Sequence, residues 1–281
     1  MDLIPFARAS NELILKLFGP SAEYLGEHWR SKLEERAQRN AGRVATRAIE
    51  KLGSRIEEPG EIPPRALRGI LEEAQYSEDE VSVEYVSGVL ASSRTPDGKD
   101  DRAISITATI SRLSSFSLLA HYIWYTELKR IFNGIDTDNL TLSRALMFMP
   151  YSVFDAAIGD DLADDFGNFT HAIQYLEKES LVSGVTYGSA DTIREYLRYE
   201  STQLLGPPAL PEDASGMLIA PTSVGLDLYL WSQGAGGVVV DYFFEDYFKP
   251  ELIPGIVIPD GARSVGGMFR EAGFGTIGFI E

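Results

Sequence analysis

The segment from His171 to Gly234 constrains the fold of this chain most strongly. It begins with HAIQYLEKESLV, in which apolar residues recur at helical spacing. After a mixed stretch it continues with MLIAPT, typical of a buried strand, then a PTSVG turn and the apolar helix pattern of VGLDLYLWS. Together with helical patterns upstream, this order predicts an α+β protein, predominantly helical, that includes a winged-helix-like module.

Composition places the chain among ordinary globular proteins. It has 281 residues, of which 44% are apolar and 24% charged, enough for two domains. It contains no cysteine, which removes cysteine nucleophiles, disulfides and thiolate metal sites and fits a reducing cytoplasm. The N-terminal residues lack the pattern of a signal peptide, and no uninterrupted apolar run has the length of a membrane span. We therefore expect a cytoplasmic protein without a membrane span.

The net charge of −17 bears on the choice of partner. Such a field repels nucleic acids and anionic membranes at long range, and it would attract a basic partner. An ordinary acidic surface is the simpler interpretation of this charge. The composition therefore argues against nucleic acid and favours a protein partner or self-association.

Three regions are expected along the chain. Residues 1–134 form an N-terminal helical bundle, with one long helix over 21–56 whose apolar stripe includes Val44, Ala48, Leu52 and Ile56. A further helix is expected to begin at Ser77, because Glu80 follows three residues later as in a capping box. Two more are expected at about 101–113 and 115–132.

Residues 135–235 are expected to form the winged-helix-like module. Its apolar run LSRALMFMPYSVF fits a strand or a buried helix equally well. Helices are expected over 168–179, 192–205 and 224–232, with strands over 181–187 and at MLIAPT. The tail, residues 236–281, alternates glycines with apolar residues, which predicts short strands packed on the module.

Four segments resemble a known family. They are LFGPSAEYLGEHW, EEAQYSEDEVSVEYVSGVLASSRTP, AIQYLEKESLV and APTSVGLDLYLW, which together lie within residues 15–235. Their pattern is similar to that of the Abi-alpha proteins, a bacterial domain family of unknown biochemical function linked with phage defence. This chain departs from the pattern at Tyr85-Val86, where a tryptophan–alanine pair is usual, and at Ser180, which replaces a glycine. The resemblance implies a role in abortive infection without implying a mechanism, because these motifs are structural.

A row of basic residues follows the expected long helix at spacings of three and four. Such a row predicts a site for phosphate groups, RNA or an acidic partner. The alternative is a solvated face, or pairing with carboxylates of the same protein, and this alternative is favoured. The row consists of Arg36, Arg39, Arg43, Arg47, Lys51 and Arg55.

An acidic cluster lies near the expected start of the helix over 168–179. Its i,i+4 carboxylates could hold Mg²⁺ or Mn²⁺ for phosphoester chemistry. Acidic residues also stabilise a helix N-terminus as caps and through the helix dipole, and that interpretation is favoured. No cofactor is predicted. The cluster consists of Asp160, Asp161, Asp164 and Asp165, with Asp155 upstream.

Two further features have alternative interpretations. His121 lies in the apolar stretch LLAHYIWY and is expected to be a core residue rather than a catalytic or metal-binding one. The segment DYFFEDYFKPEL, residues 241–252, could form an exposed docking strip, although burial of its aromatic side chains is favoured.

We therefore expect a non-enzymatic component of phage defence that acts through protein contacts, since no catalytic signature is found. The first alternative is a winged-helix transcription regulator, which the acidic character of its expected reading helix and of the approach to it argues against. The second is a metal-dependent nuclease or phosphodiesterase centred on the acidic cluster.

Overall fold

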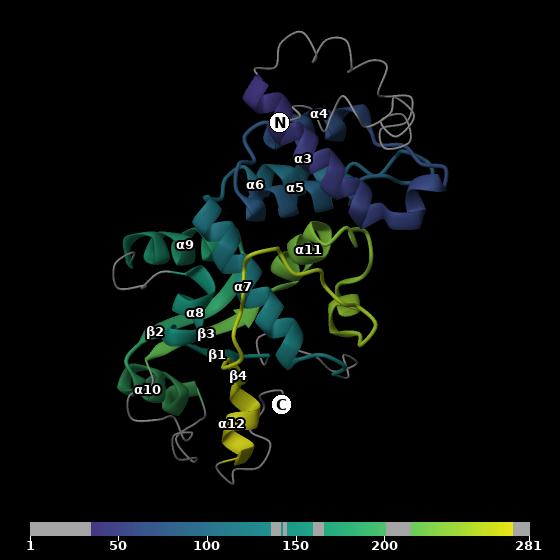
Figure 1. Ribbon diagram of the computed structural model, residues 1–281. Helices are drawn as coiled ribbons and strands as arrows, with labels where there is room; N and C mark the ends of the chain where they lie inside the picture. Colours follow the sequence, from purple (N-terminus) through teal and green to yellow (C-terminus); the bar gives the residue numbers. More distant parts are fainter. Residues whose placement is uncertain (1–34, 136–141, 143–144, 160–165, 201–214, 272–281) are drawn as a thin grey trace. The chain divides into compact units, whose positions relative to one another are not determined.

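A computed structural model describes residues 35–135, 142, 145–159, 166–200 and 215–271 (Figure 1). The chain divides into two compact units. Unit 1 comprises Met1–Leu118 and Asp227–Val238, and unit 2 comprises Leu119–Leu226 and Val239–Glu281.

This division differs from the predicted domain boundaries at residues 134 and 235. The chain changes unit within α7 (Ser115–Ile131), within α11 (Ser223–Ser232) and again after Val238. Both helices are apolar around most of their circumference, so neither a proline nor a polar linker marks the transition in the sequence.

Unit 1 is helical over its described residues. Its elements are α3 (Glu35–Leu52), the 3-10 helix η1 (Gly53–Glu57), α4 (Pro64–Ala74), α5 (Glu80–Ser92) and α6 (Ala103–Ile110), with the unit 1 parts of α7 and α11. The part of the predicted 21–56 helix that precedes Glu35 lies outside the described residues. The predicted apolar stripe is confirmed, because Val44, Ala48, Leu52 and Ile56 are all buried.

Helix α5 is the central element of unit 1, and every residue from Val83 to Ser92 is buried. Its N-cap is Asp79, whose carboxylate accepts hydrogen bonds from the backbone N–H of Ser82 (2.8 Å) and from the Ser82 hydroxyl (2.7 Å). The predicted cap at Ser77 is wrong. The Ser77 hydroxyl donates to the carbonyl of Glu73 in the preceding helix (3.2 Å), so it continues α4 rather than starting α5.

A buried ion cluster joins α3 to α5. Glu84 of α5 accepts a hydrogen bond from Arg47 Nε (2.9 Å), and its other oxygen accepts from Lys51 Nζ. The side chains of Lys51 and Glu84 are only 1% and 2% exposed. Because each charge has left water, its ion-pair partner determines whether this arrangement is stable.

We expect Glu84→Gln to lower the free energy of unfolding by about 3 kcal/mol, because Lys51 would remain charged in a buried site that has lost its carboxylate. Chemical denaturation measures this change. Glu80→Gln is the matched control. Glu80 pairs with Arg43 (2.5 Å) but is 59% exposed, so its loss should cost less than about 1 kcal/mol. Equal effects of the two substitutions would contradict the prediction.

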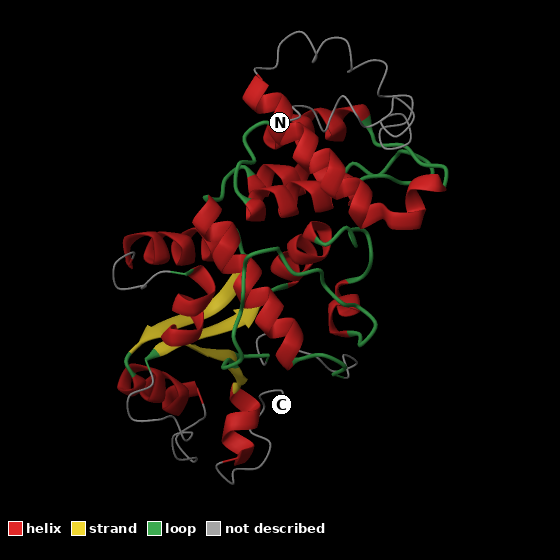
Figure 2. Ribbon diagram, in the orientation of Figure 1, coloured by secondary structure: helices red, strands yellow, loops and turns green. Residues whose placement is uncertain are grey.

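Unit 2 is built around a four-stranded antiparallel sheet in the order β2-β3-β1-β4 (yellow in Figure 2, labelled in Figure 1). The strands are β1 (Met147–Pro150), β2 (Val182–Gly188), β3 (Gly216–Pro221) and β4 (Arg263–Ser264). The helices are α8 (Tyr151–Ile158), α9 (Phe166–Lys178), α10 (Ala190–Glu200) and α12 (Val265–Glu271), with the unit 2 part of α7. The expected strand over 181–187, the strand at MLIAPT and the helix over 168–179 are confirmed within one or two residues.

The ambiguous apolar run contains both predicted alternatives. It forms strand β1 and then helix α8, with Pro150 as the N-cap of α8. Proline restricts the preceding residue to extended backbone and has no N–H to donate within a helix, so the strand ends and the helix begins at Pro150. On one face of the sheet, Phe148 and Leu218 pack in a core with residues of α10 and α12, among them Ile193, Leu197 and Phe269.

The prediction of a strand-rich tail is wrong for the described part of residues 236–271. The 3-10 helix η3 (Val240–Phe244), the two-residue strand β4 and helix α12 are its elements there. Gly237 and Gly255 have positive φ values of 88° and 87°, so they form turns rather than strand positions. Phe243 and Phe244 anchor the irregular segment by burial.

Among the described residues, no single helix has the length and apolar character needed to cross a membrane. The bent pair α6 and α7 passes the length and composition criterion only when the two helices are taken together.

Candidate functional site

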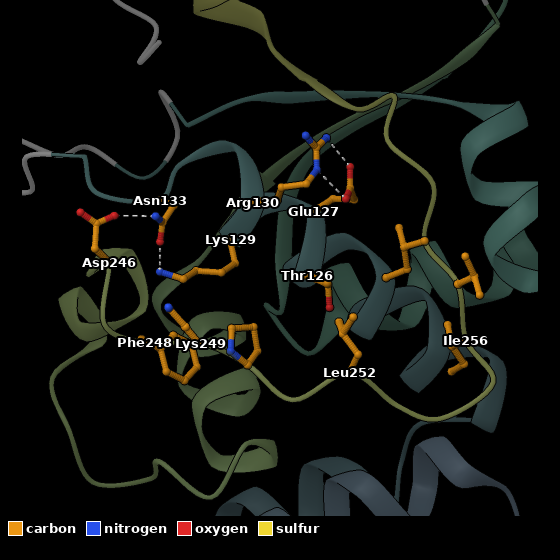
Figure 3. A pocket seen from close by; sticks show the side chains of 13 residues that line it. Thr126, Glu127, Lys129, Arg130, Asn133, Asp246, Phe248, Lys249, Leu252 and Ile256 are labelled. Carbon is orange, nitrogen blue, oxygen red and sulfur yellow. Dashed lines mark hydrogen bonds and ion pairs between the residues drawn. The ribbon is translucent and has the colours of Figure 1, made fainter.

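The candidate site is a groove in unit 2, between the C-terminal half of α7 and the segment from Asp246 to Ile258 (Figure 3). Its volume is about 540 Å³, within the range of small-molecule binding sites. Helix α7 supplies four charged or polar residues of its wall, Thr126, Glu127, Lys129 and Arg130, and the irregular segment after η3 supplies the apolar wall.

The apolar wall combines buried and exposed side chains. Phe248 is 6% exposed and forms part of the base, whereas Leu252 and Val257 are 62% and 73% exposed. Pro250, Ile256 and Ile258 line the same wall. Contiguous exposed apolar side chains at a concave surface are characteristic of binding sites, because they lose contact with water when a ligand covers them.

One polar cluster of the groove is a pair on α7. Glu127 is buried and accepts two hydrogen bonds from Arg130, at 2.9 and 2.7 Å. Arg130 also donates to the carbonyl of Ala262 (3.0 Å) and lies 3.5 Å from the exposed carboxylate of Asp260. The hydrogen bonds from the guanidinium to Glu127 raise the pKa of Arg130. Both oxygens of Glu127 are therefore occupied within the protein.

The second polar cluster is centred on Lys129. Its ammonium donates to Asn133 Oδ1 (2.6 Å) and to the carbonyl of Glu245 (2.7 Å), and lies 5.5 Å from the ring centroid of Phe248. Burial lowers the pKa of Lys129, partly offset by the nearby Asp246 and Glu245. Asn133 in turn donates to Asp246 (2.5 Å). This chain of contacts attaches the segment after η3 to α7.

The predicted docking strip, residues 241–252, contains both predicted alternatives. Phe243, Phe244 and Phe248 are buried, as favoured, whereas Tyr247 and Leu252 are 65% and 62% exposed. The polar residues of the groove were not among the site residues predicted from the sequence. The available signal was the charged ELKR at the end of the apolar helix pattern of α7, where an acid and a base stand three residues apart.

The basic row lies largely against carboxylates of unit 1. Arg43 pairs with Glu80, while Arg47 and Lys51 pair with Glu84. Arg55 donates to the carbonyls of Lys51 (3.2 Å) and Gly234 (3.0 Å). The pairing interpretation thus describes Arg43, Arg47 and Lys51. Anion binding by the row stays a prediction; Arg39 is exposed, and the side chain of Arg36 lies outside the described residues.

The predicted metal-binding residues Asp160, Asp161, Asp164 and Asp165 lie outside the described residues. Helix α8 ends before them, at Gly159, which has a positive φ and donates its N–H to the carbonyl of Asp155. Elsewhere in the described ranges, no three histidine, aspartate or glutamate side chains converge so as to hold a metal ion.

His121 is a core residue, as expected. It is fully buried and stacks on Tyr125, with 4.3 Å between ring centroids. Burial lowers its pKa to about 3, although a hydrogen bond with the backbone of Gly225 acts in the opposite direction. The imidazole is therefore neutral in the folded protein at neutral pH.

His121 should make the protein acid-sensitive. Its pKa is lower in the folded than in the unfolded state, so the unfolded state binds the extra proton between pH ~6.5 and about 3. As pH falls through this window, protonation of His121 in the unfolded state lowers the free energy of unfolding by about 1.4 kcal/mol per pH unit. We expect His121→Phe to unfold with a correspondingly shallower pH dependence. His171→Phe, at an exposed histidine, controls for loss of an imidazole, and equal slopes for wild type and His121→Phe would contradict the prediction.

Comparison with protein-family models, with curated proteins and with solved structures found no match to this chain.

Proposed function

We propose that this chain is a non-enzymatic, cytoplasmic component of bacterial phage defence that works by binding. In this proposal the groove of unit 2 receives the molecule that triggers the response, and contacts with protein partners transmit it. The observation that carries the proposal is the groove itself, because Leu252 and Val257 expose apolar surface at a concave site with charged groups at its rim.

The biological setting of the proposal comes from the resemblance to the Abi-alpha family. The segments that carry it include AIQYLEKESLV, which covers much of α9, and APTSVGLDLYLW, which covers the turn from β3 into α11. Neither segment contributes to the lining of the groove, which lies within residues 126–133 and 246–258. The resemblance therefore supports a defence role, and the groove supports binding as the means.

Phage plating on bacteria with controlled expression of this chain tests the proposal. We expect expression to reduce plaque formation or to arrest growth on infection. Leu252→Asp and Val257→Asp should abolish this effect at unchanged protein level, because each places a carboxylate on the apolar wall. Both side chains are exposed, so folding should be retained.

The matched control is Tyr76→Ser, which removes an apolar side chain that is 78% exposed in unit 1. It should protect as well as wild type. Absence of protection by wild type across a diverse phage panel would refute the defence role. Full protection by Leu252→Asp and Val257→Asp would refute the part assigned to the groove.

A second candidate is the winged-helix transcription regulator, which the topology of unit 2 favours. Along the chain, β1 is followed by α8, α9, β2 and β3, and β3 lies between β2 and β1 in the sheet. A helix pair inserted between the first and second of three such strands is the arrangement that a winged-helix module requires. Helix α10 lies in the connection between β2 and β3, where a wing would be.

The exposed face of α9 supports this candidate more than the sequence indicated. Its described exposed residues include Asn168, His171, Gln174 and Lys178, side chains that can hydrogen-bond to base edges or phosphates. Only Glu177 adds negative charge to that exposed set. Five of the seven acidic residues that argued against a reading helix precede α9 in the chain, and the other two, Glu177 and Glu179, lie at its C-terminal end.

If unit 2 reads DNA, the purified chain should enrich duplexes from a randomised pool at physiological salt. Gln174→Ala should then weaken binding to an enriched duplex by about 1 kcal/mol or more, because a base contact is lost. Gln38→Ala, at an exposed glutamine on α3, is the control. Failure to enrich any duplex would remove the regulator candidate.

A further inference from the structure

The groove of unit 2 contains more positive than negative charge, although the whole chain is strongly acidic. Its lining includes three cations, Lys129, Arg130 and Lys249, and two carboxylates, Glu127 and Asp246. The lining therefore has an excess of one positive charge, from three minus two. The chain as a whole carries −17.

The two carboxylates of the groove are engaged within the protein. Glu127 accepts both of its hydrogen bonds from Arg130, and Asp246 accepts from Asn133. Lys129 is likewise held by Asn133 and by the carbonyl of Glu245. Lys249 is exposed and, among the described residues, makes no ion pair within 4.0 Å. Its ammonium is the group of the lining most available to a ligand.

The cationic and apolar parts of the groove are separated in space. Figure 3 shows Lys249 beside Phe248 on the same side as Lys129 and Asn133, with Leu252 and Ile256 toward the opposite end. A ligand that satisfies both parts must be elongated, with a charged group at one end and an apolar body at the other. A monoanion matches the single exposed ammonium of Lys249, because Lys129 and Arg130 are engaged within the protein, whereas a dianion such as a phosphate monoester would leave uncompensated negative charge.

From this arrangement we propose that the groove binds a long-chain monocarboxylate of the fatty-acid class. The carboxylate pairs with Lys249, and the hydrocarbon chain lies along Phe248, Leu252 and Ile256. The repulsion from distant carboxylates of the protein is screened beyond about 8 Å at physiological ionic strength, so the nearby ammonium of Lys249 governs the contact. This ligand class rests on the proposed function, because it presupposes that the groove of unit 2 is a binding site.

Titration calorimetry of the purified full chain with laurate tests the inference. We expect saturable binding, with affinity that rises about two- to fourfold per added methylene from decanoate to myristate, because each methylene leaves water. Dodecanol, which has the same chain without the charge, should bind about three- to tenfold more weakly. Dodecyltrimethylammonium should bind more weakly still.

Two variants locate the site. Lys249→Gln should reduce the affinity for laurate to about that for dodecanol, and leave dodecanol binding unchanged. Leu252→Asp should abolish binding of both compounds. Lys99→Gln, at an exposed lysine of unit 1, is the matched control and should bind laurate as wild type does. Thermal unfolding should be alike for all variants, because each changed side chain is exposed.

Several outcomes would overturn the inference. Equal affinities for laurate and dodecanol would refute the carboxylate contact, and laurate binding that survives Leu252→Asp would place the ligand elsewhere. A dimer that Leu252→Asp dissociates, with no laurate binding by wild type, would assign the groove to a second copy of the chain. Calorimetry is independent of phage protection, so failure of the defence role is distinguishable from failure of the ligand assignment.

Discussion

The hydroxyl of Tyr125 holds unit 2 together at the point where its helices and sheet meet. It donates to the carbonyl of Leu181, at the start of β2, and accepts from the N–H of Thr222 (3.2 Å), at the end of β3. Gly225 permits this contact, because a Cβ there would lie 1.9 Å from the Tyr125 hydroxyl oxygen. The backbone groups joined by this hydroxyl are buried or partly buried, so loss of the contact would leave them without a partner at substantial cost.

This contact also explains the PTSVG turn and, through α7, the groove. Thr222 accepts a hydrogen bond from the N–H of Gly225 (3.0 Å) and donates to the carbonyl of Ser180 (2.6 Å), so it caps α11 and attaches the turn to the end of α9. Tyr125 lies on α7 one turn before Lys129, so the same contact fixes the helix that forms the polar wall of the groove. The geometry of the candidate site therefore depends on hydrogen bonds made at the sheet.

Charge has two different roles in this chain. In unit 1 the basic residues of α3 serve largely to compensate carboxylates of α5, where the buried Glu84 requires cationic partners. In the groove of unit 2 the carboxylates are engaged by Arg130 and Asn133, and Lys249 remains exposed. A count of charges along the sequence does not distinguish these cases, because the distinction depends on which side chains are desolvated together.

The sequence by itself determined most of the elements and the kind of core. Helical spacing of Val44, Ala48 and Leu52 identified the buried face of α3, and the run MLIAPT identified β3, because burial of apolar side chains is periodic in both structures. It also placed His121 in the core. It did not locate the transition between units inside α7 and α11, since an apolar helix can change its packing partners without a change of pattern. Only the tertiary structure brought Glu127 and Lys129 opposite Phe248 and Leu252, because residues more than a hundred positions apart meet only when the segment after η3 folds back onto α7.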